Sequence, residues 1–233
     1  MKTFLSICLL LSCCSFLEAE EKKSFSFSQK PSPLHVSLKK KRFYELLLPP
    51  TQKTYKHLYS QFIRIKDELK KGVHTEEIQA LKTLYKVKSD RDLLLALKPH
   101  PISITIAQAA MESAWGTSRF FKEANNVFGM WSGNSKDKRI AAGEKRNGKR
   151  TIWLRKFDNI EESVSEYYKT LGRAKAYKKF REYRYESDDV YTIVKGLDKY
   201  SELGKEYVET ISTLIWHNDL TKYDLKESKN END

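Results

Sequence analysis

The segment Gln108-Ala-Ala-Met-Glu112-Ser-Ala-Trp115-Gly116-Thr-Ser118 lies in the middle of a 233-residue chain and decides how the rest can fold around it. It continues an apolar run, so we predict a helix from Ser103 to about Gly116. At helical spacing, Gln108, Ala109, Trp115 and Gly116 surround Glu112 on one face. A carboxyl group beside an indole and small residues is partly desolvated, which raises its pKa. Glu112 is therefore a candidate general acid, although an ordinary solvated helix glutamate has the same local pattern.

A β-hairpin is predicted after this helix. Asn147-Gly148 is the strongest short turn signal in the chain, because both residues tolerate the positive φ of a type I′ turn. The flanking residues 140–146 and 149–157 can then pair as antiparallel strands. In that register Glu144 lies opposite Thr151 and shares a face with Ala142 and Trp153.

Helical periodicity recurs on both sides of this centre. Residues 42–98 are predicted to form a helical N-terminal region of three helices, with Thr75 and Ser89 as N-caps of the second and third. Asp158 and Glu161 are a candidate capping box for a later helix. The apolar stripe of this helix comprises Ile160, Val164, Tyr167, Tyr168 and Leu171. The apolar stripe of the last helix comprises Tyr207, Ile211, Leu214 and Ile215. The predicted fold class is α+β, mostly helical, with one small hairpin.

Both ends of the chain are predicted to lie outside this fold. Residues 1–19 have the basic start, short apolar run and small residue of a secretory signal peptide, so we expect an exported, periplasmic or envelope-associated protein. A lipoprotein signal competes with this interpretation, since Cys13 and Cys14 follow Leu-Leu-Ser. Residues 20–41 are rich in Ser, Lys and Pro and are predicted to be a linker, and residues 221–233 a charged tail.

The amino-acid composition limits the kinds of molecule that this protein is expected to bind. Lys and Arg number 43 against 31 Asp and Glu, a net charge of +12 that suits an anionic polymer or membrane surface. Nucleic acid is disfavoured, because the basic residues are spread along the chain and no nucleic-acid-binding motif occurs. All three cysteines lie before residue 15, and the five histidines show no ligand spacing, so we expect no metal and no cofactor.

The segment quoted above, with Asn125-Asn126-Val127-Phe128-Gly129 after it, resembles the bacterial endo-β-N-acetylglucosaminidase family, glycoside hydrolase family 73. Within that family it looks most like the Bax-type proteins, because Met130-Trp131-Ser132 follows Phe128-Gly129. The resemblance implies a lysozyme-like domain over residues 99–220, with a cleft between a helical lobe and a β-lobe. It also implies cleavage of peptidoglycan glycan strands after N-acetylglucosamine, with Glu112 as the catalytic acid.

The same resemblance suggests further site residues. Glycoside hydrolysis usually needs a second carboxylate, and Glu144 matches the family's hairpin glutamate, although four basic residues around it depart from the family pattern. Asp137 is the alternative. Tyr200 is expected to line the cleft near the acid, whereas Tyr207 is predicted to be core.

Candidate substrate-binding residues are Gln108, Trp115 and Trp131, the tryptophans by stacking on sugar rings. Trp115 is equally suited to packing between lobes, and Phe128 better suited to it. Asn125 and Asn126 fit a turn-shaping role better than sugar binding. Two functions compete with hydrolysis: lytic transglycosylation, which needs one glutamate, and non-catalytic glycan binding on the same fold.

Overall fold

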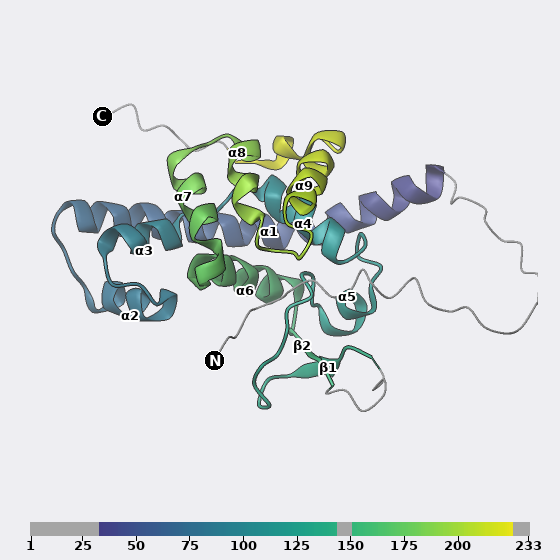
Figure 1. Ribbon diagram of the computed structural model, residues 1–233, viewed down its shortest axis with the longest axis horizontal. Coiled ribbons are helices and arrows are strands. Elements are labelled where there is room, and N and C mark those ends of the chain that lie inside the picture. Colours follow the sequence, from purple (N-terminus) through teal and green to yellow (C-terminus); the bar gives the residue numbers. More distant parts are fainter. Residues whose placement is uncertain (1–32, 144–150, 226–233) are drawn as a thin grey trace, which may run out of the picture.

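The computed structural model describes residues 33–143 and 151–225, which form nine α-helices and a two-stranded sheet (Figure 1). The elements before residue 144 are α1 (Pro33–Lys70), α2 (Glu76–Tyr85), α3 (Asp90–Leu97), α4 (Ile102–Glu112), α5 (Arg119–Ala124) and β1 (Arg139–Ala141). Those after residue 150 are β2 (Trp153–Arg155), α6 (Ile160–Arg173), α7 (Lys178–Glu186), α8 (Val190–Val194) and α9 (Lys205–His217). The predicted mostly helical α+β class is confirmed.

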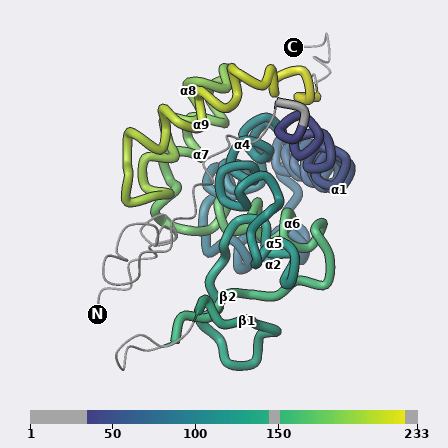
Figure 2. Tube along the Cα trace, turned by 90° about the vertical axis from the view of Figure 1, so that its right-hand side faces the viewer, coloured from purple at the N-terminus to yellow at the C-terminus, as the bar shows by residue number. Residues whose placement is uncertain are grey.

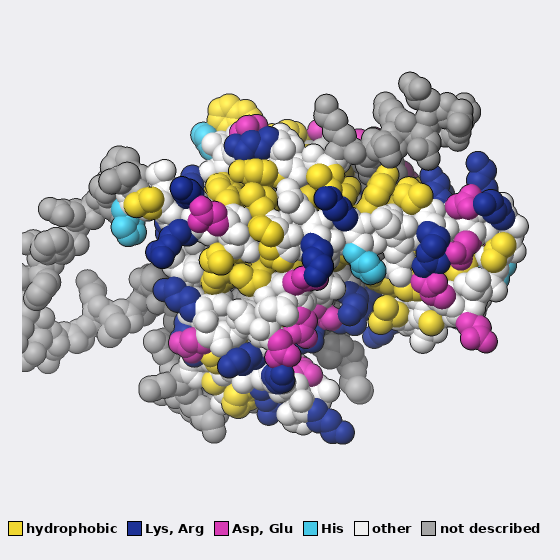
Figure 3. All heavy atoms as spheres, turned by 180° about the vertical axis from the view of Figure 1, so that it is seen from behind, with side chains coloured by type: hydrophobic (Ala, Val, Ile, Leu, Met, Phe, Trp, Pro, Cys, Tyr) yellow, Lys and Arg dark blue, Asp and Glu magenta, His cyan; other side chains and the backbone are white. Residues whose placement is uncertain are grey.

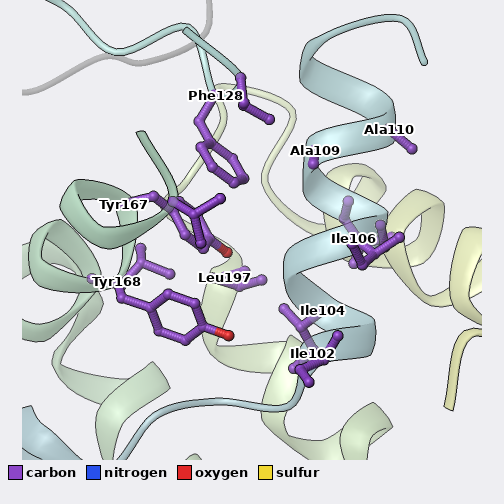
Figure 4. Close-up of a cluster of buried hydrophobic side chains, with 14 of the residues drawn as sticks. Ile102, Ile104, Ile106, Ala109, Ala110, Phe128, Tyr167, Tyr168 and Leu197 are labelled. Atoms are coloured by element: carbon purple, nitrogen blue, oxygen red, sulfur yellow. The ribbon is translucent and has the colours of Figure 1, made fainter. Parts of the chain in front are cut away.

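Helix α4 is the centre of the molecule. Every residue from Ile102 to Ala110 is buried, because α1, α8, α9 and a 3₁₀ turn at Leu220–Tyr223 pack around it. Figure 4 shows Phe128 and the two tyrosines of α6, Tyr167 and Tyr168, lying along one side of α4. Its isoleucines fill the core, and its alanines let neighbouring elements approach closely.

The sequence predicted that this helix continues to about Gly116. In the structure α4 already ends at Glu112. Ala114, Trp115 and Gly116 all have positive φ angles, of 51°, 61° and 74°, so the chain turns out of the helix directly after the glutamate. Apolar periodicity did not reveal this end, because two of the three residues are not glycine and rarely adopt such angles.

Helix α1 corrects the predicted linker at residues 20–41, because it begins at Pro33 and continues for 38 residues through Pro49 and Pro50. Proline normally disrupts a helix interior. Here Leu47, two residues before the pair, and Thr51, directly after it, are fully buried, so packing on the core holds the helix together. The Ser, Lys and Pro composition at its start concealed this amphipathic helix.

Helices α1, α2 and α3 confirm the three predicted N-terminal helices, and the side chains of Thr75 and Ser89 cap the last two. They are not a separate unit. The C-terminal part of α1 packs with α2 and α3 around a second hydrophobic core. This core comprises Phe62, Ile65, Ile78, Leu81, Tyr85, Leu93, Ala96 and Leu97. Phe43, Leu47 and Tyr55, in the part of α1 before Phe62, belong to the main core around α4.

Strands β1 and β2 form the predicted antiparallel hairpin, which projects from one side of the helical body (Figure 2). Its register differs by one residue from the prediction, because Ala141 and not Ala142 lies opposite Trp153. A two-residue turn at 147–148 requires the Ala142 pairing, so turn chemistry alone misjudged the register. Residues 144–150, including Glu144 and the predicted turn, lie outside the described residues.

Two further boundaries differ from the prediction. Asn159, not Asp158, caps α6 by accepting from the backbone N–H of Glu162, whose carboxylate accepts in return from the N–H of Asp158. The predicted tail at residues 221–233 begins too early, because Asp224 belongs to the fold. Its carboxylate accepts from both the backbone N–H and the hydroxyl of Ser103, each at 2.7 Å, and so caps the first turn of α4. The apolar stripe of α6 is confirmed, since Val164, Tyr167, Tyr168 and Leu171 are buried.

Among the helices within residues 33–143 and 151–225, none combines the length and the apolar character that a bilayer crossing requires.

Replacing Gly196 with alanine should destabilise this fold. An added Cβ would lie 2.4 Å from the Cα and 2.7 Å from the backbone nitrogen of Phe180 in α7. Two backbones must then separate, which we expect to lower the free energy of unfolding by about 2–3 kcal/mol in urea denaturation. Gly133→Ala is the matched control, because no atom lies within 4 Å of its added Cβ. Equal stability of the two variants would contradict this close packing.

Candidate active site

Glu112 is the last residue of α4 and lies half-buried where the helix meets the turn at residues 113–116. Its position follows from the burial of α4. The helix is surrounded by protein along its length, and its C-terminal residue is the first whose side chain combines a charge with access to solvent. The structure therefore places Glu112, the acid predicted from the sequence, at the boundary between the buried core and the solvent.

Three buried side chains form a hydrogen-bond chain that ends on Glu112. The hydroxyl of Tyr167 on α6 donates to Oε1 of Gln108. Nε2 of Gln108 donates to the hydroxyl of Tyr207 on α9 at 2.8 Å. The hydroxyl of Tyr207 donates to Oε1 of Glu112 at 3.0 Å. Three separate helices thus converge on one carboxyl group.

The direction of this chain is set by Gln108. Its amide oxygen is occupied by the Tyr167 proton, so its nitrogen must face Tyr207. Tyr207 accepts there, and its single proton is left for Glu112. Burial raises the pKa of both tyrosines well above the ordinary value, so both hydroxyls keep their protons in the physiological pH range.

The electrostatic environment suits an acid. Burial raises the pKa of Glu112 to about 7, and the hydrogen bond from Tyr207 opposes the rise because it stabilises the carboxylate. Since Oε1 already accepts from Tyr207, the neutral acid carries its proton more favourably on Oε2. No hydrogen-bond donor within the described ranges holds Oε2. A glutamate near half-protonation at neutral pH can donate a proton to a leaving group.

The two tyrosines have different outcomes. Tyr207 is fully buried, which confirms its predicted place in the core, and its hydroxyl also contacts Glu112, which was not predicted. Tyr200, predicted to lie near the acid, is 2% exposed and stacks on Tyr207 with ring centroids 5.2 Å apart. It therefore supports the tyrosine that contacts Glu112. Tyr207 was missed because a tyrosine on an apolar helical stripe gives no sign of where its hydroxyl points.

The predicted substrate-binding residues divide into three cases. Gln108 is completely buried with both ends of its amide engaged, which contradicts a direct contact with sugar. Trp115 is half-buried and packs against Phe43 and Tyr44 of α1, so it has a packing contact, but with α1 and not between the lobes as the alternative had it. Trp131 is 41% exposed and bridges to Leu154 of β2, so its ring remains accessible on the β-lobe.

The asparagines shape the connection between the two lobes, as predicted. Asn125 is the C-cap residue directly after α5 and has the left-handed conformation. Nδ2 of Asn126 donates to the carbonyls of Met130 and Arg155, at 2.9 and 2.8 Å, and its Oδ1 accepts from the N–H of Met130. Phe128 packs face to face on Tyr167, with ring centroids 3.9 Å apart, which confirms its packing role. The β-lobe is thereby attached to the helix that starts the hydrogen-bond chain.

The second carboxylate has one candidate within the described residues. Asp137 lies on the loop before β1, where it is half-buried and accepts from the hydroxyl of Ser132 at 2.9 Å. Glu144 lies outside the described residues. Residues 33–143 and 151–225 contain no group of three His, Cys, Asp or Glu side chains arranged to hold a metal ion.

Comparison with known proteins gives two curated relatives. The chain is 31% identical over 167 residues to the exo-glucosaminidase LytG of Bacillus subtilis (strain 168), covering 64% of this chain and 56% of LytG. It is 34% identical over 113 residues to Protein bax of Escherichia coli (strain K12), covering 46% of this chain and 39% of that protein. The chain thus spans about half or less of the length of these relatives.

Among solved structures, the catalytic domain of the autolysin Auto from Listeria monocytogenes is similar, with 22% identity and a TM-score of 0.44 over 76% of this chain and 88% of that one. A likeness at that score supports no argument about function. The sequence profile of the family described as mannosyl-glycoprotein endo-beta-N-acetylglucosaminidase matches residues 94–220, more than half of the chain. The protein therefore belongs to this glucosaminidase family.

Proposed function

We propose that this protein hydrolyses the β-1,4 glycosidic bond that follows N-acetylglucosamine in peptidoglycan, with Glu112 as general acid. The observation that carries the proposal is the half-buried carboxyl group with a pKa of about 7, held by a single oriented hydrogen bond inside a domain of the glucosaminidase family. The name of one relative agrees with it, since LytG is an exo-glucosaminidase.

In the proposed first step, neutral Glu112 gives its Oε2 proton to the glycosidic oxygen as the bond to the anomeric carbon breaks. The glutamate becomes a carboxylate at that moment. The Tyr207 hydroxyl, already donating to Oε1, stabilises this new charge without moving. Gln108 and Tyr167 hold that hydroxyl in place and are positioning residues.

The positive charge that develops on the sugar needs a partner. We propose Glu144 on the hairpin as base or nucleophile, from the family resemblance, with Asp137 as the alternative. Trp131, exposed on the β-lobe, is the proposed stacking surface for a sugar ring. A route assisted by the substrate's own acetamido group requires neither carboxylate.

We further propose that the chain is exported and acts in the periplasm or on the envelope, as a released protein or as a lipoprotein through Cys13 or Cys14. The net charge of +12 then favours association with anionic envelope polymers or a membrane surface. On the face in Figure 3, Lys and Arg side chains lie scattered among acidic ones. Such association should therefore be diffuse and weakened by salt.

Glu112→Gln should lower the cleavage of purified sacculi by about 10²–10⁴-fold, the range for loss of a general acid. Glu209→Gln is the matched control, because Glu209 is exposed on α9. Product ends separate the competing reactions. Reducing N-acetylglucosamine ends indicate hydrolysis, and anhydro-muramyl ends would establish lytic transglycosylation. Binding of sacculi with no cleavage by the unaltered chain would leave only the glycan-binding function.

Tyr207→Phe should move the falling limb of the pH–kcat profile to higher pH. The lost hydrogen bond stabilises the carboxylate, so its removal raises the pKa of Glu112 further above 7. Tyr168→Phe is the control, since its hydroxyl contacts Thr105 and the carbonyl of His100. A limb that stays in place, or moves to lower pH, would contradict the role given to Tyr207.

Glu144→Gln and Asp137→Asn distinguish the candidates for the second carboxylate. If Glu144 is the second carboxylate, Glu144→Gln should lower kcat by about a hundredfold. Asp137→Asn should then leave kcat within about threefold of that of the unaltered enzyme. The reverse result assigns the role to Asp137. Full activity in both variants removes both carboxylates from the mechanism and favours the substrate-assisted route.

A further inference from the structure

We propose that helix α1 positions the catalytic acid by clamping Trp115, and that Phe43 and Lys40 are positioning residues for glycan cleavage. All of α1, Pro33–Lys70, precedes the family domain, whose matched residues begin at 94. The proposal rests on the proposed role of Glu112 as the acid. It concerns the turn that directly follows that residue.

The turn after Glu112 is held in an unusual backbone conformation. Ala114, Trp115 and Gly116 adopt positive φ in succession, and for a bulky residue such as Trp115 this costs free energy. Local hydrogen bonds fold the turn back on α4: the N–H of Trp115 donates to the carbonyl of Ala110, and the N–H of Gly116 to the hydroxyl of Ser113, both at 2.8 Å. Such a conformation persists only where surrounding contacts enforce it.

Helix α1 supplies those contacts. The Trp115 ring meets the edges of Phe43 and Tyr44, with centroids 5.4 and 6.0 Å apart, and Nζ of Lys40 lies 4.7 Å from its centroid. Phe43 is 1% exposed and also lies beneath Gly116, where an added Cβ would be 3.5 Å from its ring. Three residues spanning little more than one turn of α1 therefore enclose the indole.

The same turn of α1 also holds the helix that carries Tyr207. Nζ of Lys40 donates to Oδ1 of Asn218 at 2.6 Å, and Asn218 is the C-cap residue directly after α9. Nδ2 of Asn218 in turn donates to the carbonyl of Leu214 within α9 at 2.8 Å. Lys40 thus touches both the turn behind the acid and the helix of its hydrogen-bond donor, so α1 fixes the two sides of the Glu112–Tyr207 pair relative to each other.

Loss of the clamp should therefore act on catalysis before it acts on folding. Without the aromatic contacts the strained turn can relax toward a longer helix, which displaces the Glu112 carboxyl group from Tyr207. Water then reaches the carboxyl group. Because burial is the largest influence on the pKa of Glu112, that hydration lowers the pKa, the direction opposite to the one expected for Tyr207→Phe.

The test compares Phe43→Leu with Phe62→Leu in the full chain. Both are buried phenylalanines of α1, 1% and 4% exposed, but Phe62 belongs to the second core and contacts Tyr59 and Tyr185. Each substitution replaces one buried phenyl ring with a leucine side chain, so the two should lower the melting temperature by similar amounts. We expect Phe43→Leu alone to lower kcat, by about tenfold, with little change in KM. Its pH–kcat profile should also fall at lower pH.

Lys40→Met is the second variant, because it keeps the apolar stem and removes both the cation over Trp115 and the donor to Asn218. We expect a smaller loss of kcat in a fully folded protein. Equal kcat per folded molecule in both phenylalanine variants and in Lys40→Met would overturn the proposal. So would a gain of activity in Phe43→Leu, which would make α1 inhibitory.

The proposed function is tested separately in the same assay. An unaltered chain that cleaves no glycan, or a Glu112→Gln variant with full activity, contradicts that function. An active chain that depends on Glu112 and is indifferent to Phe43 and Lys40 contradicts only the role of α1.

Discussion

Glu112 is subject to two opposing influences, burial that favours its neutral form and a hydrogen bond from Tyr207 that favours its ionised form. Neither exists without the surrounding fold. The burial requires α4 to be enclosed by other helices, and the hydrogen bond requires α9 to present Tyr207 at the C-terminal end of α4. The architecture can be understood as the arrangement that satisfies both requirements at once, with Gln108 and Tyr167 directing the Tyr207 proton.

Helix α4 is enclosed not only by the family domain, residues 94–220, but also by segments before and after it. The part of α1 before Phe62 supplies Phe43, Leu47 and Tyr55 to the main core, and Asp224 caps the N-terminus of α4 from beyond residue 220. Both ends of the central helix are thus held by segments outside residues 94–220. Since a buried helix loses its hydrophobic stabilisation when one side is uncovered, these segments are part of the site's support and not appendages to it.

The parts of this protein that could be predicted from its sequence are those governed by local pattern. The apolar stripe of α6 and the caps Thr75 and Ser89 follow from spacing, and Glu112 from its extended motif. The end of α4, the strand register and the partner of Glu112 are decided by long-range contacts. Trp115 has a positive φ in a turn whose indole packs on α1, far away in the sequence. Tyr207 contacts the acid because α9 crosses α4 at that height, which no spacing within α9 records.

The raised pKa of Glu112 has a cost for the fold. An unfolded glutamate ionises near pH 4.5, whereas the folded one ionises near pH 7, so the folded state binds more protons between those values. The stability linked to this group is complete below about pH 4.5 and is lost as pH rises through 7. Discounted for its partial exposure, the loss is on the order of 1–2 kcal/mol. A carboxyl group that is kept desolvated therefore weakens the fold that holds it, and the aromatic contacts of α1 with Trp115 lie on the turn directly beside that group.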